Sequence, residues 1–195
     1  MEAERLIETG RRALAASRGG PAVMTEAWQA QALARAVGGR LARCGPVELR
    51  TEARQLGEAG GPGGQMPDHP AMPAPTGGVR AAQLTEVADV RQTLTALGHL
   101  LGETGIALVG VACDTEEGLY WPCIEAIDAV DEAVDRVQGM LRRLAAQTHE
   151  RDREGVHERD GGPGAHAPGA ARGARVPRGS HGALSGPAGI VSGPP

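Results

Sequence analysis

Apolar residues recur every three or four positions from about residue 120 to residue 144, and this is the clearest pattern in the chain. Such spacing places one side chain per turn on a single face of an α-helix. Acidic residues precede the arginines along the same stretch, as the helix dipole favours. Because proline is harmless only in a first turn, Pro122 places the start of the helix between Gly118 and Trp121. The apolar positions are Tyr120, Cys123, Ile127, Val130, Val134, Val137, Leu141 and Leu144.

A second long helix is predicted between Val87 and Val111. Its apolar residues follow the same spacing, with Thr104 as the one polar interruption, so each long helix has a heptad-like apolar seam. The run Ile106–Ala112 also fits a buried strand, but the continuous seam favours a helix. A short turn over Asp114–Gly118 would join the two helices as an antiparallel pair. The apolar positions of this second seam are Val87, Val90, Leu94, Leu97, Leu101, Leu108 and Val111.

The N-terminal part of the chain predicts three shorter helices, over Ala3–Ser17, Pro21–Arg43 and Pro46–Ala59. Glycine and proline separate them, and both Pro21 and Pro46 suit a first helical turn. Inward faces are indicated by Leu6, Ile7 and Leu14 in the first, by Met24, Trp28, Leu33, Val37, Leu41 and Cys44 in the second, and by Leu49, Ala53 and Leu56 in the third. The predicted fold class is therefore all-α, an antiparallel bundle of four to five helices.

Two segments lack any periodicity. Residues 60–78 are dense in glycine and proline and predict a flexible loop within the bundle. Residues 155–195 contain 11 glycines and 6 prolines among 41 residues, which predicts a disordered low-complexity tail. The expected organisation is a single helical domain over residues 1–154, followed by the tail.

Composition narrows the classes of partner. The formal net charge is −4 for the whole chain and −6 for residues 1–154, which have 16 arginines against 22 acidic residues. Nucleic-acid binding needs a basic face, so no nucleic-acid partner is expected. The longest apolar run, Ile106–Cys113, is too short to span a bilayer, so no membrane partner is expected either. We expect a cytoplasmic protein.

Three cysteines, Cys44, Cys113 and Cys123, form no zinc-ribbon spacing and follow no secretory signal. An odd number of cysteines fits a reducing compartment, where each is expected to act as a small buried apolar residue. Cys113 and Cys123 flank the predicted turn between the long helices, but the spacing supplies no further ligands for a zinc ion.

A mixed metal site can be drawn from His99 and Glu103, one turn apart, together with the acidic residues of the last helix. The Glu-x-x-His step of metal-binding bundles is missing, and those acidic residues flank the apolar seam, where charges are usually hydrated. They are Glu125, Asp128, Asp131, Glu132 and Asp135. The favoured interpretation is a hydrated face, and we predict no metal, no cofactor and no catalytic residue.

Tyr120 and Trp121 are two of the three aromatic residues in the chain. Adjacent helical residues point in different directions, so Tyr120 in the seam would leave Trp121 turned partly outward. An exposed tryptophan at the end of a bundle suits a partner contact, while the simpler alternative is that it covers the turn. These two residues are the only candidate site.

Four stretches resemble a family of short actinobacterial proteins catalogued as a domain of unknown function. They are MEAERLIE (1–8), EAWQAQALA (26–34), GGVRAAQLTEV (77–87) and GIALVGVACDTEEGLYWPCIEAIDAVDEA (105–133). The resemblance covers most of residues 1–148 and implies no activity and no site residues. The sequence leaves the function open between a non-enzymatic bundle that acts by protein–protein contact, with a homodimer as one form, and a ligand- or metal-binding bundle.

Overall fold

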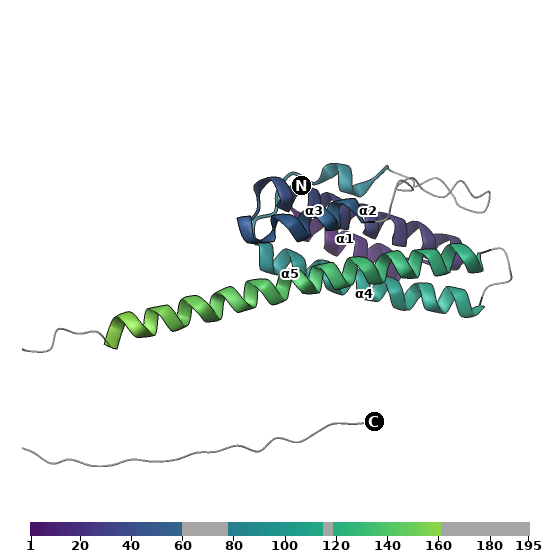
Figure 1. Cartoon of the computed structure of the whole chain (residues 1–195). Helices are drawn as coiled ribbons and strands as arrows, with labels where there is room; N and C mark the ends of the chain where they lie inside the picture. The colour runs from purple at the N-terminus through teal and green to yellow at the C-terminus, as the bar shows by residue number, and fades with distance from the viewer. Residues whose placement is uncertain (60–77, 115–118, 161–195) are drawn as a thin grey trace, which may run out of the picture.

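The computed structural model describes residues 1–59, 78–114 and 119–160 (Figure 1). Five α-helices lie within these ranges: α1 (Ala3–Ala16), α2 (Gly20–Cys44), α3 (Arg50–Glu58), α4 (Val90–Asp114) and α5 (Tyr120–Asp160). Two short 3-10 helices are η1 (Val47–Leu49) and η2 (Arg80–Gln83). The predicted all-α fold is confirmed. The strand alternative for Ile106–Ala112 is wrong, since these residues lie inside α4.

Helices α4 and α5 form an antiparallel pair. Gly98 of α4 faces Val137 of α5, and Gly105 faces Val130, so residue numbers rise along one helix as they fall along the other. A β-carbon added to Gly98 would lie 3.5 Å from Val137 Cγ1, which shows how closely the helices approach. Figure 1 shows α5 running along the bundle and continuing past the ends of the other helices.

The core consists of leucine, alanine and other aliphatic residues drawn from all five helices. The predicted α4 seam is confirmed from Leu94 to Val111, and Thr104, its polar interruption, is also buried and donates a hydrogen bond to the Leu100 carbonyl at 2.7 Å. Val87 lies before the first residue of α4, where Asp89 instead caps the helix by accepting a hydrogen bond from the Gln92 N–H at 2.8 Å.

The α5 seam is confirmed in part: Cys123, Val130 and Val137 are fully buried, and the half-buried seam residues that pack against the core are Ile127, Val134, Leu141 and Leu144. The prediction for Tyr120 is wrong: this residue is exposed, and the preceding Leu119 is buried in its place. Tyr120 is the first residue of α5, so no earlier turn of the helix flanks it. The helix also continues to Asp160, past the predicted boundary at residue 154.

Helices α2 and α3 cross at a glycine contact. A β-carbon on Gly38 would lie 2.6 Å from the backbone nitrogen of Gly57 and 2.7 Å from the carbonyl oxygen of Ala53. Only glycine fits so close an approach of two backbones. The predicted third helix is divided in two, because Val47–Leu49 form a 3-10 turn before α3 begins at Arg50.

The segment that follows residue 77 is fixed to both α2 and the N-terminus. The buried Gln29 side chain donates a hydrogen bond to the Gly78 carbonyl at 2.9 Å and accepts one from the Arg80 N–H at 3.0 Å. The N-terminal amino group donates to the Gln83 carbonyl at 2.6 Å, next to an isolated parallel bridge between Glu2 and Glu86. Except for Gly78, the predicted loop lies outside the described residues, as does the chain from residue 161 onward.

Candidate interaction face

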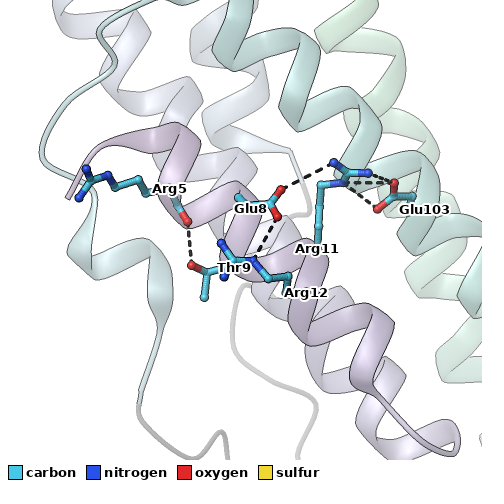
Figure 2. Close-up of polar contacts among 6 residues, drawn as sticks. All are labelled: Arg5, Glu8, Thr9, Arg11, Arg12 and Glu103. Atoms are coloured by element: carbon cyan, nitrogen blue, oxygen red, sulfur yellow. Dashed lines mark hydrogen bonds and ion pairs between the residues drawn. The ribbon is translucent and has the colours of Figure 1, made fainter.

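The predicted pair of His99 and Glu103 does not come together with the acidic residues of α5. Glu103 instead accepts hydrogen bonds from Arg11 of α1, one from Nε at 2.9 Å and another from Nη2 (Figure 2). This two-pronged contact, with the charge of Arg11, lowers the pKa of the Glu103 carboxyl, and the nearby His99 adds to the effect. Glu103 is therefore neutralised by an arginine, which disfavours a role as a metal ligand.

The acidic residues of α5 lie at the surface, as the sequence predicts: Glu125, Asp128, Asp131, Glu132 and Asp135 are all exposed. Among residues 1–59, 78–114 and 119–160, no group of three histidine, cysteine or acidic side chains is placed to hold a metal ion. Glu132 pairs with Arg136, one turn further along the same helix, at 2.6 Å.

The three cysteines do not share one environment. Cys123 is buried with its Sγ 3.5 Å from Met24 Sδ, and burial raises the pKa of its thiol. Cys44 and Cys113 are exposed, so the prediction that all three are buried is wrong for these two. Cys44 is the last residue of α2 and Cys113 the last but one of α4, and helix ends leave the packed interior.

A hollow beside the N-terminus of α4, of about 450 Å³, contains cationic side chains. Arg11 contributes to it but is already paired with Glu103, and Arg91 donates a hydrogen bond to the Thr148 hydroxyl at 3.3 Å. Exposed His99 and the capping Asp89 also line it. Because the arginines have partners and an acidic residue is present, this hollow has little capacity for an anion.

The outward side of α4 is apolar in the second half of the helix. Ile106 is 77% exposed and Val109 is 49% exposed, although both belong to the longest apolar run of the chain. Glu103 is the only charged residue between Leu100 and Cys113, and it points toward Arg11. Large apolar side chains exposed together on a folded protein mark contact surfaces more often than isolated ones do.

These residues border a shallow groove of about 360 Å³ between α4 and α5. Gly102 lines the groove with open space where its β-carbon would stand, so the backbone of α4 is accessible there. We call this surface the α4–α5 face. Its lining consists of Leu101, Gly102, Gly105, Ile106 and Val109 of α4 and Ile127, Asp131 and Val134 of α5.

Tyr120 lies at the end of the α4–α5 face. It is two turns before Ile127, which places it on the side of α5 that borders the groove. The Tyr120 and Trp121 rings meet edge to face, with centroids 5.4 Å apart, and are 43% and 69% exposed. Trp121 is therefore exposed, but the reason predicted for it is wrong, because Tyr120 is exposed beside it and does not lie in the seam. The sequence analysis did not identify Ile106 and Val109 as exposed. Both lie outside the predicted seam of α4, and that position is the signal that could have identified them.

Helix α4 is the one described helix long and apolar enough to cross a membrane by length and composition, which is weak evidence because core helices of soluble proteins also meet this criterion. In this structure α4 packs against α1, α2 and α5. Helix α4 has more apolar residues than its contacts with the other helices bury, and the remaining ones form its exposed apolar side.

A family model described as "Family of unknown function (DUF6099)" matches residues 1–143. No curated protein matches the chain, and no solved structure matches it.

Proposed function

We propose that this chain, which belongs to the DUF6099 family of unknown function, is a non-enzymatic helical-bundle protein that binds another protein through the α4–α5 face. The observation that supports this most is the exposure of Ile106, at 77%, beside a groove open to the α4 backbone. Removing such side chains from water on binding provides about 25 cal/mol per Å² of apolar surface. We place this contact in the cytoplasm, where free cysteines such as Cys44 and Cys113 persist.

Tyr120 and Trp121 extend the proposed contact. Tyrosine and tryptophan are enriched among the residues that dominate binding energy, because they remove a large rigid surface from water at little entropic cost. Their position at the end of the α4–α5 face supports one continuous contact surface rather than two separate ones.

The test is an exposed-surface substitution with a matched control. Ile106→Asp introduces a charge on the α4–α5 face, and Val47→Asp does the same at Val47, a 68% exposed residue of η1. Tagged full-length chains are used to capture proteins from the native cytosol after circular dichroism has shown that both variants keep their helices. We expect a partner retained by the wild type and by Val47→Asp but lost by Ile106→Asp. If both substitutions leave the captured proteins unchanged, the proposal is wrong.

A homodimer is the simplest form of this contact and is tested separately. Size-exclusion chromatography with light scattering would report a dimer that Ile106→Asp dissociates and Val47→Asp does not. A monomer at the highest attainable concentration would exclude the homodimer and leave a different protein as the partner.

A further inference from the structure

The rim of the α4–α5 groove is acidic on one side and uncharged on the other. Asp131 lines the groove from α5, and Asp128 and Asp135 lie about one turn before and after it. Spacings of three and four residues place the three carboxylates on one side of the helix. None of them has an ion-pair partner among the described residues, and α5 contains no arginine before Arg136.

The opposite rim and the floor of the groove are apolar. Ile106 and Val109 form the α4 rim, while Gly102 and Gly105 lower the floor. From Leu101 to Val109 the α4 side of the groove is about 12 Å long, which matches about two turns of a docked helix. Absent side chains at glycine allow the axis of a docked helix to come closer than the usual 8–10 Å.

Resting on the proposed function, we infer that this groove takes an amphipathic helix of another protein, with its apolar edge over Gly102 and Gly105 and lysine or arginine facing Asp128, Asp131 and Asp135. Docking of an amphipathic helix into an apolar groove is a common mode of recognition, and the three carboxylates select the charge of its flank.

Other occupants fit the charges less well. A second copy would offer its own α4 face, where the only charge between Leu100 and Cys113 is the paired Glu103, so it brings no cation to Asp131. A membrane surface that attracts peripheral helices is usually anionic, and it would be repelled by the same carboxylates.

The experiment uses the full-length chain and three fluorescent helical peptides of about 18 residues, a length at which a designed helix is stable. All three share one leucine–alanine edge, and their flanks are arginine, glutamine or glutamate. Fluorescence anisotropy gives each Kd. Since each exposed charge pair contributes only modestly, three pairs together predict that the arginine peptide binds about tenfold more tightly than the glutamine peptide.

Two sets of matched variants test the placement. The triple variant Asp128→Asn, Asp131→Asn, Asp135→Asn should abolish the preference for arginine, whereas Glu48→Gln, Glu58→Gln, Glu125→Gln changes the net charge equally at exposed carboxylates outside the groove and should keep it. Gly102→Leu should fill the groove and weaken binding at least tenfold. Gly110→Leu is the control, because Gly110 also has open space around it but does not line the groove.

The outcomes separate this inference from the proposed function. The inference would be overturned if the three peptides bind equally, or if both acidic triple variants lose the preference for the arginine peptide equally. It would also be overturned if no peptide binds at about 1 mM. A dimer that Gly102→Leu dissociates would also overturn it, because the occupant would then be a second copy, yet it would support the proposed function. Binding to neutral lipid vesicles that Ile106→Asp abolishes would overturn both.

Discussion

At the scale of single residues, Arg11 and Glu103 join α1 to α4 at the surface of the bundle. The Arg11 guanidinium makes a two-pronged contact with the Glu103 carboxylate and also lies 3.8 Å from Glu8 (Figure 2). Both groups are part exposed, so water screens their attraction and the contribution to stability is small. Its dependence on pH is nonetheless well defined, because the hydrogen bonds from Arg11 are the largest cause of the lowered pKa of Glu103.

A lowered pKa in the folded state means that this contribution is complete above the pKa of Glu103 in the unfolded chain. It is lost as the pH falls through the folded pKa. We therefore expect Glu103→Gln to lower the free energy of unfolding by a small, constant amount between about pH 6 and 8, and the difference from wild type to shrink below about pH 4.5. Urea unfolding at a series of pH values measures this. A difference that grows on acidification would contradict the pairing.

The cysteines show where residue-scale prediction fails. A buried aliphatic environment was expected for all three, and only Cys123 has it. Periodicity identifies the face of a helix on which a residue lies, but it does not report whether another element covers that face at that level. Cys44 and Cys113 lie at helix ends, where coverage stops.

At the scale of the elements, the crossing of α2 and α3 depends on Gly38. Gly38→Ala would place a methyl group within 3 Å of backbone atoms of Ala53 and Gly57, and no change of rotamer can relieve a clash with backbone. We expect the free energy of unfolding to fall by about 2 kcal/mol in urea denaturation, despite the better helix propensity of alanine.

Gly102→Ala is the control for this substitution. Its new methyl group meets open space, so the gain in helix propensity, up to about 1 kcal/mol, should appear as increased stability. Equal stability of wild type and Gly38→Ala would show that α2 and α3 do not approach so closely in solution.

The long helices were predictable because burial imposes a period on the sequence. The inward positions of α4 and α5 follow that period, and most are buried or half-buried against the core. The α4–α5 face was not predictable beyond its aromatic end. The seam identifies the buried side of α4 only. Whether Ile106 and Val109, on the other side, are covered depends on how the other helices pack, and no described residue covers them.

At the scale of the whole molecule, α5 consists of two parts with different surroundings. Its first part packs against α2, α3 and α4, and its last part extends beyond them (Figure 1). Among the described side chains, Met140 is the last that is fully buried, and Leu144 is the last apolar one packed against the core. Residues after Glu150 are therefore expected to contribute little to the stability of the bundle.

A chain that ends at Glu150 tests this division. We expect its free energy of unfolding in urea to stay within about 0.5 kcal/mol of the full-length value, because it keeps every described apolar residue that packs against the core. Its far-ultraviolet circular dichroism should lose helical signal from residues 151–160. The control ends at Arg136 and also removes Val137 and Met140, both fully buried, so it should lose several kcal/mol or fail to fold. If both truncations destabilise the protein alike, the C-terminal part of α5 packs against the bundle, and the free extension in Figure 1 is wrong.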